Sequence, residues 1–370
     1  MVSMNKVILS NLAHRPIRSI ISVTAVAVEV TLILVIVGLS MGILNDAKNR
    51  QAGIGADLMV KPPGSSMVGN LSSAPVSIKV ADVIAKQAHV KAVAPVITQF
   101  NTSGAVEILY GIDIPSFEAV GSPFVYLEGG PFTGPDDILV DEYIASSKNL
   151  HVGDTMEAMN HPFRICGIVA NGKGARKFMP IKTVQDLLGA ENKASIFYVK
   201  LDDPAKTDEV IAQLKQVPGM GSYGIQSMKE WLSLMTPDNI PGFSAFIKVV
   251  VGVAVCIGFI VIFQSMYTAV MERTREIGIL KSMGASKTYV VRLILRESLM
   301  MAVAGIVIGI LLSELARLGI VSRFPTVRVM IEWSWILKAT GIALAGALLG
   351  AVYPAYRAAE KDPIDALAYE

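Results

Sequence analysis

Residues able to do covalent chemistry are few in this 370-residue chain, and they form no known catalytic pattern. The sequence lacks a Gly-x-x-x-x-Gly-Lys-[Ser/Thr] phosphate loop, a His-Glu-x-x-His motif, a Gly-x-Ser-x-Gly motif and a Cys-x-x-Cys motif. Gly172-Lys173-Gly174 predicts only a hairpin turn. The four histidines, His14, His89, His151 and His161, are scattered, as is typical of surface residues. The sequence therefore predicts no enzyme, and no cofactor or metal bound by this chain.

Glu29 is a carboxylate in an unusual place, the middle of an apolar run over residues 17–44. An ionised carboxylate at the centre of a membrane costs about 2.5–3.5 kcal/mol on insertion scales, and such residues often mark function. One reading is that Glu29 faces a cavity and meets cargo or a proton there. The other is that it stays protonated and hydrogen-bonds a neighbouring helix, for instance through Ser22 or Thr31 of a second copy. Lys248 is a further candidate partner.

Residues 272–297 combine charge with a helical pattern between two apolar runs. We expect a short helix that ends at Gly284, since glycine readily takes the left-handed conformation that closes helices. Ser286 would then cap the next helix. This elbow could transmit a push from a soluble partner to membrane helices, or it could be a positive loop that only fixes topology. The residues predicted to contact such a partner share this segment: Arg275, Glu276, Ile277, Ile279, Leu280, Met283, Gly284, Ala285 and Ser286.

Composition indicates a membrane protein, because 52% of residues are hydrophobic, 17% are charged and the mean hydropathy is +0.51. Four runs are long enough to cross a bilayer, which takes about 20 residues: 17–44, 242–271, 298–318 and 333–356. Small residues let membrane helices approach closely, so a packed bundle is predicted. Its glycines are Gly252, Gly258, Gly305, Gly309, Gly341, Gly346 and Gly350.

The distribution of Lys and Arg predicts the orientation of these spans. Basic residues flank the start of the first span and fill the elbow, and they return in the tail at 357–370. We therefore expect both termini in the cytoplasm, with residues 1–16 as an amphipathic helix on the membrane surface. Residues 45–241 and the loop 319–332 would lie outside. The net charge of +2 is too small to suggest nucleic acid as a partner.

The large outer segment, residues 45–241, has turn signals and mixed helix and strand patterns that predict an α+β domain. Its last part, residues 225–235, is amphipathic and predicts a stalk that extends the second span. In this interpretation Trp231, Leu232 and Leu234 pack the stalk against the extension of the first span near Leu44. Inserting two glycines after Met235 should then abolish transport.

Three stretches resemble the MacB/FtsX-like ABC transporter permeases, which include the MacB pumps and the lipoprotein-releasing LolC and LolE subunits. They are Asn11-Leu12 with Arg15 and Arg18, the elbow 272–297, and the tail, in which Tyr353-Pro354-Ala355-Tyr356 precedes Asp362-Pro363. The outer stretches 138–154 and 166–169 also look like a MacB-type periplasmic core. These stretches occur in the same order as in the family, and the resemblance covers essentially the whole chain. The resemblance implies four transmembrane helices and a large α+β extracytoplasmic domain of MacB periplasmic-core type.

The resemblance also implies a function. Such a permease works as a dimer, with a second copy or a homologue, in the inner membrane and in contact with lipid. Two copies of a separate ATPase bind ATP and Mg, and the elbow is the coupling helix that seats on this ATPase. ATP-driven movement of the spans displaces the outer domains, a mechanism called mechanotransmission that suits export or extraction from the periplasm or outer leaflet. The alternative is an FtsX-like regulator that triggers a cell-wall hydrolase outside. The cargo, and the presence of a periplasmic adaptor and outer-membrane channel, are left open.

Overall fold

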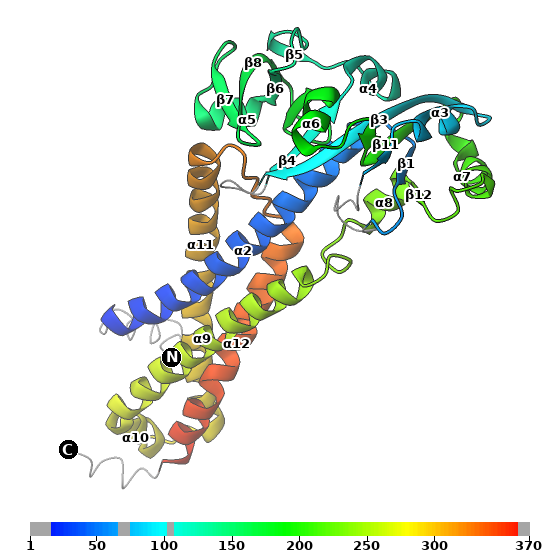
Figure 1. Cartoon of the computed structure of the whole chain (residues 1–370). Coiled ribbons are helices and arrows are strands. Elements are labelled where there is room, and N and C mark those ends of the chain that lie inside the picture. Colours follow the sequence, from blue (N-terminus) through cyan, green and yellow to red (C-terminus); the bar gives the residue numbers. More distant parts are fainter. Residues whose placement is uncertain (1–15, 66–74, 102–106, 362–370) are drawn as a thin grey trace. The chain divides into compact units, whose positions relative to one another are not determined.

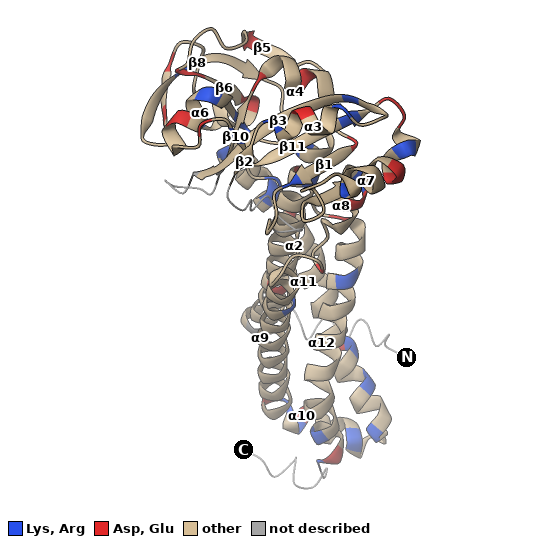
Figure 2. Cartoon of the chain, turned by 45° about the vertical axis from the view of Figure 1, so that its right-hand side comes forward, with Lys and Arg blue, Asp and Glu red and all other residues tan. Residues whose placement is uncertain are grey.

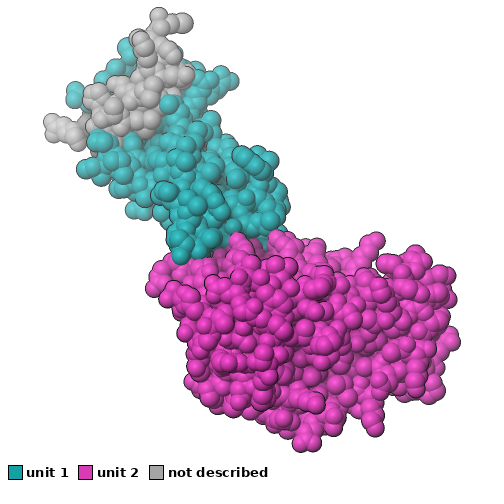
Figure 3. Space-filling view, turned by 90° about the horizontal axis from the view of Figure 1, so that it is seen from above, with its two compact units in different colours: residues 1–41, 242–322, 329–370 teal, residues 42–241, 323–328 magenta. Residues whose placement is uncertain are grey.

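The computed structural model describes residues 16–65, 75–101 and 107–361. Residues 1–15 of the surface helix expected over 1–16, and residues 362–370 of the tail expected over 357–370, lie outside the described residues. The chain divides into two compact units (Figure 3). The first, here called the helical unit, consists of Met1–Met41, Gly242–Ser322 and Val329–Glu370. The second, here called the sheet unit, consists of Gly42–Pro241 and Arg323–Arg328.

Four long helices are apolar enough to cross a membrane: α2 (Pro16–Ala52), α9 (Phe243–Glu272), α11 (Lys287–Arg323) and α12 (Trp333–Glu360) (Figure 1). Three of these helices are longer than the predicted runs, and α12 continues beyond residue 356 to Glu360. α2 continues beyond residue 44 to Ala52, and α11 begins at Lys287 and ends at Arg323. Hydropathy marks only the part of a helix that is apolar on all sides, whereas backbone hydrogen bonding continues into the polar turns at either end.

Small residues bring these helices together at some of the predicted glycines. A Cβ atom added at Gly305 would lie 2.6 Å from Val26 Cβ, and one at Gly309 would lie 2.7 Å from the Ala27 carbonyl oxygen. Gly258 and Gly350 are similarly close to α2 and α9. Gly252, Gly341 and Gly346 have no such neighbour. Helix α12 adds fully buried alanines at helical spacing, Ala339, Ala343, Ala347, Ala351 and Ala355.

The sheet unit is built on one mixed ten-stranded sheet with the strand order β12-β1-β11-β3-β4-β9-β6-β8-β5, and β7 pairs with β8. The β4–β9 and β6–β8 pairs are parallel, and the other pairs are antiparallel. The strands are β1 (Leu58–Lys61), β3 (Val90–Asn101), β4 (Glu107–Ile112), β5 (Tyr126–Gly129), β6 (Asp137–Asp141), β7 (Thr155–Ala158), β8 (His161–Val169), β9 (Lys177–Pro180), β11 (Ile196–Leu201) and β12 (Gly224–Ser227). Two short strands, β2 (Val76–Ser77) and β10 (Lys193–Ala194), form a separate pair.

Helices cover this sheet and complete an α+β unit, as the sequence predicts. They are α3 (Val80–Ala85), α4 (Ile114–Val120), α5 (Glu142–Lys148), α6 (Ile181–Leu188), α7 (Thr207–Gln216) and α8 (Met228–Leu234), with the 3-10 turn η1 (Pro204–Lys206) before α7. Alternate residues of β11 enter different cores: Phe197 and Val199 pack with α7 residues, whereas Ile196 and Tyr198 pack with Trp231 and Phe117. The central sheet is therefore buried on both faces.

The predicted stalk is not one helix. Residues 224–227 form strand β12, which pairs with β1, and α8 ends at Leu234. Residues 235–242 are not helical, and α9 begins only at Phe243. The amphipathic pattern over 225–235 comes from a strand and a short helix that enter different cores: Ile225 of β12 packs with residues of α7, whereas Met228 and Trp231 of α8 pack with Phe117 and Tyr198.

Candidate functional site

The elbow between α9 and α11 has the geometry predicted from its sequence. Helix α10 (Thr274–Ser282) is closed by Gly284, whose φ is +94°. The N–H of Ala285 donates to the Leu280 carbonyl (3.0 Å) and the N–H of Gly284 donates to the Lys281 carbonyl (3.0 Å), the bond pair of a Schellman motif. Ser286 Oγ then accepts from the N–H of Tyr289 (3.2 Å) and caps α11.

The predicted apolar contacts of the elbow separate onto two faces of α10. Ile277 is buried in the core of the helical unit, and Leu280 is half-buried. Both side chains line one small cavity between α10 and α11. Ile279 and Met283 point away, with 42% and 70% of their surfaces exposed. Residues four apart share a helix face, whereas residues two apart do not. Ile277 and Leu280, which the sequence predicts to contact a partner, therefore face the interior, and the exposed face consists of Arg275, Glu276, Ile279 and Met283.

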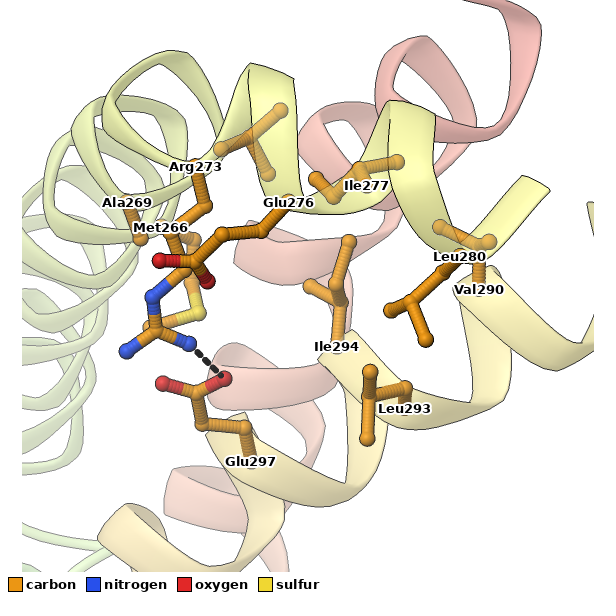
Figure 4. A pocket seen from close by; sticks show the side chains of 11 residues that line it. Met266, Ala269, Arg273, Glu276, Ile277, Leu280, Val290, Leu293, Ile294 and Glu297 are labelled. Atoms are coloured by element: carbon orange, nitrogen blue, oxygen red, sulfur yellow. Dashed lines mark hydrogen bonds and ion pairs between the residues drawn. The ribbon is translucent and has the colours of Figure 1, made fainter. Parts of the chain in front are cut away.

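A buried ion pair holds the elbow onto α11. Arg273, between α9 and α10, donates to Glu297 Oε2 of α11 at 3.1 Å (Figure 4). Only 10% of the Arg273 side chain and 5% of the Glu297 side chain are exposed. They border a cavity of about 100 Å³ that Ile277, Leu280 and Ile294 also line. Both charges lie within residues 272–297, but their pairing could not be predicted from the sequence because it depends on how α10 folds back.

A second contact joins the elbow to the end of α12. Lys281 Nζ donates to the carbonyl oxygen of Ala359 (2.9 Å) and to that of Lys361. This brings two of the three stretches singled out in the sequence, the elbow and the tail, into contact. Lys and Arg also gather along α10 and the adjoining half of α11, so this end of the helical unit is basic (Figure 2).

Glu29 lies on α2 against α9 and is 3% exposed. Its carboxylate occupies the space that a Cβ at Gly258 would take, and its Oε1 has no hydrogen-bond partner among the described residues. It borders an otherwise nearly apolar cavity of about 390 Å³ between α2 and α9. Within the same chain, Ser22 bonds Ser265 (2.5 Å) and Thr31 donates to the carbonyls of Ala27 (2.7 Å) and Gly309 (3.1 Å). These hydroxyls already have partners.

The three residues predicted for the stalk lie in helix α8 of the sheet unit. Trp231 is 1% exposed and packs in the core with Ile54 and Met59, and Leu232 packs against that core. Leu234 is half-buried. Lys61 Nζ lies 5.6 Å from the centre of the Trp231 ring. Leu44 is not in this core cluster. Trp231 therefore stabilises the sheet unit itself rather than a helical extension of α9.

No group of three or more His, Cys, Asp or Glu residues that could hold a metal ion occurs in the described ranges 16–65, 75–101 and 107–361. The candidate site is the elbow, which the Arg273–Glu297 ion pair and the caps at Gly284 and Ser286 hold in place.

Two family models match the chain: the MacB-like periplasmic core domain over residues 19–217 and the FtsX-like permease C-terminal region over residues 248–363. A "Macrolide export ATP-binding/permease protein MacB" from Mannheimia succiniciproducens is 24% identical over 398 residues, which cover 97% of this chain and 59% of that protein. The protein of the same name from Rhodopirellula baltica is 32% identical over 182 residues, which cover 47% of this chain and 26% of the Rhodopirellula protein. The chain thus spans less than two thirds of the length of these relatives.

Among solved structures, the periplasmic region of MacB from Actinobacillus actinomycetemcomitans is similar at 20% sequence identity and a TM-score of 0.38. The similarity covers 52% of this chain and 97% of that structure.

Proposed function

Because the chain belongs to the family of MacB/FtsX-like ABC transporter permeases, we propose that it is a membrane subunit driven by a separate ATPase. The carrying observation is the elbow, a capped helix with an exposed mixed face, between two helices long enough to span a membrane. In this proposal ATP and Mg bind to that ATPase and not to the membrane subunit. The protein would lie in the inner membrane. Both termini and the elbow would face the cytoplasm, because the elbow and its surroundings are basic.

The exposed face of α10 is proposed to seat on the ATPase. Ile279 and Met283 supply apolar contact, and Arg275 and Glu276 supply a charged rim, which is the usual anatomy of a protein interface. A push on α10 would pass to α11 through Arg273 and Glu297 and to α12 through Lys281. The elbow would thereby act on two spans together.

Two such permeases, with two ATPase copies, would move their sheet units during the ATP cycle and so export or extract a substrate from the periplasm or the outer leaflet. A periplasmic adaptor and an outer-membrane channel would complete the assembly if the substrate leaves the cell. The second candidate, a trigger for a cell-wall hydrolase, is favoured by the FtsX-like match over residues 248–363. The two differ in whether a periplasmic enzyme is captured with the complex.

The test is capture of the ATPase by the full-length protein solubilised from membranes. Met283→Asp and Glu276→Lys each place a wrong charge on the exposed face and should lower the amount of captured ATPase at least tenfold. Leu127→Asp, at a residue that is 52% exposed in the sheet unit, is the matched control and should capture normally. Normal capture by both elbow variants would refute the docking surface. A cell-wall hydrolase captured with wild type would favour the second candidate.

A further inference from the structure

A cavity of about 380 Å³ inside the sheet unit has an excess of positive charge in its wall. The described residues that line it all belong to 42–241 or 323–328, so the cavity belongs to this unit alone. Three of these residues are arginines, Arg50, Arg176 and Arg328, and one is acidic, Asp46. The volume falls in the range of about 300–1,000 Å³ that is typical of ligand pockets. The cavity therefore suits an anionic ligand.

Arg176 is neutralised by the sheet unit itself. Its guanidinium donates to Asp46 Oδ2 (3.0 Å) and to Asp141 Oδ2 (3.1 Å). It also donates to the carbonyl oxygen of Thr326 (3.1 Å), and only 12% of its side chain is exposed. Arg176 therefore holds the wall of the cavity together and is not the group that an added anion would meet.

Arg50 and Arg328, by contrast, have donors that the described residues leave unused. Arg50 donates through Nη1 to Asp46 Oδ2 (2.6 Å), an oxygen that it shares with Arg176, and its Nε is buried without a partner. The donors left for a ligand are thus those of its two terminal nitrogens. Arg328 donates to the Tyr143 hydroxyl and lies 4.3 Å from the centre of that ring, and no carboxylate among the described residues pairs with it.

The charges of the cluster do not cancel. Three guanidinium groups, of Arg50, Arg176 and Arg328, face the carboxylates of Asp46 and Asp141. One positive charge is left over, and a ligand with one negative charge, such as a phosphodiester, would neutralise it.

Apolar side chains form much of the remaining wall. Ile43, Phe100, Ile108 and Val327 all line the cavity. Ile43 is 52% exposed, so apolar surface beside the arginines remains uncovered in the part of the chain that the structure describes. A small hydrated anion gains nothing from such surface, whereas an anion with an alkyl chain buries its apolar part there. The ligand that fits best is therefore amphipathic.

The arginines also lie in sequence where membrane spans end. Asp46 and Arg50 follow the apolar run 17–44 within the next two turns of α2, and Arg328 lies in the connection between α11 and α12. Phospholipid headgroups lie at the level where a spanning helix leaves the hydrocarbon core. The connection is predicted to lie outside, where the positive-inside rule disfavours a basic residue. Binding of an anionic headgroup gives Arg328 a reason to be there.

We propose that this cavity binds the phosphate headgroup of an anionic phospholipid. Arg50 and Arg328 would donate to the phosphate oxygens, since a guanidinium can form two parallel hydrogen bonds to them. Ile43 and Val327 would pack against the apolar part of the lipid. This inference goes beyond the proposed function, because it requires helices that cross a membrane but no ATPase.

The experiment is native mass spectrometry of the full-length protein, purified in detergent, freed of lipid and then mixed with phosphatidylglycerol. Phosphatidylcholine with the same acyl chains, whose headgroup has no net charge, is the reference. Wild type should bind the first phosphatidylglycerol about tenfold more tightly than phosphatidylcholine, because hydrogen bonds between charged groups favour the anion. Arg50→Met and Arg328→Met should each remove most of this preference. Inorganic phosphate at the same concentration should not displace the lipid.

Arg164→Met is the matched control, because Arg164 pairs with Asp137 elsewhere in the sheet unit and its side chain is 58% exposed. It should keep the preference. Val327→Lys adds a positive charge to the cavity wall and should increase the preference, a gain that a fold defect would not produce.

Three results would each overturn the proposal. The first is equal binding of the two lipids by wild type. The second is an unchanged preference in both Arg50→Met and Arg328→Met. The third is displacement of the lipid by inorganic phosphate, which would make the cavity a site for free phosphate instead.

Discussion

Asp137 is a buried carboxylate that stabilises the sheet unit through hydrogen bonds. Its Oδ2 accepts from the N–H of Thr133 (2.6 Å), from the Thr133 hydroxyl (2.8 Å) and from the N–H of Gly134 (2.7 Å), and its Oδ1 accepts from Arg164 (2.8 Å). Burial raises the pKa of this carboxyl, but the bonds from Thr133, Arg164 and Gly134 outweigh burial and lower the pKa to about 2.

Asp137→Asn should therefore destabilise the sheet unit by about 1–2 kcal/mol at pH 7. The pKa of Asp137 in the folded protein lies below its ordinary value of 3.8. The ionised Asp137 therefore contributes its full stabilisation to the sheet unit above about pH 4, and this stabilisation is lost as the pH falls toward about 2. Hydrogen exchange of the β6 backbone amides measures the stability of the sheet unit. At pH 7 these amides should be less protected from exchange in Asp137→Asn than in wild type. Asp136→Asn, at a side chain that is 61% exposed, is the neighbouring control. Equal protection in Asp137→Asn and wild type would contradict the prediction.

At the scale of the element, the elbow depends on the pairing of Arg273 with Glu297. Removing one member of a buried ion pair leaves an uncompensated charge and typically costs about 3–5 kcal/mol. Arg273→Met should accordingly loosen α10, seen as faster hydrogen exchange of its amides, and the exchanged pair Arg273→Glu with Glu297→Arg should restore part of the protection. Arg275→Met, at an exposed residue of the same helix, should leave exchange unchanged while weakening ATPase capture. Unchanged exchange in Arg273→Met would show that the pair does not hold α10.

The sequence predicted elements well where a local signal determines them. Gly284 and Ser286 act through their own backbone and side chain, so the turn of the elbow could be predicted in detail. Strand β1 was missed, because Leu58, Met59 and Val60 are buried on both faces of the sheet and show no alternation. The two faces of α10 were not separated, since Ile277 and Leu280 were predicted to contact a partner together with Ile279 and Met283, which alone are exposed.

Contacts between distant segments could not be predicted from one sequence. Arg176 meets Asp46 across 130 residues and Thr326 across 150, and no spacing rule connects them. The same holds for Arg273 and Glu297, although both charges were visible beside the elbow. Ionic pairing depends on the tertiary packing that brings the charges together. Sequence patterns thus predicted the four long apolar helices and the α+β character of the sheet unit, whereas the contacts between segments distant in sequence follow from no local pattern.

At the scale of the whole molecule, the two connections that bracket the sheet unit should respond differently to added length. The sequence alone predicted that two glycines after Met235 abolish transport, but residues 235–242 are already non-helical. We now expect this insertion to be tolerated. Two glycines after Ile43 should be damaging instead, because they interrupt the continuous helix α2 shortly before Asp46 and Gln51.

The measurement uses a spin label at Glu157→Cys in both copies of the proposed dimer, in nanodiscs with the captured ATPase, before and after trapping with ATP and vanadate. Wild type and the insertion after Met235 should show the same change in the distance between copies, and the insertion after Ile43 should show none while ATP hydrolysis continues. ATP hydrolysis is measured as the control, because its continuation shows that the ATPase is still bound and that only the movement of the sheet unit is lost. If the Met235 insertion instead removes the distance change and the Ile43 insertion preserves it, displacement reaches the sheet unit through residues 235–242, and α2 is not the element that carries it.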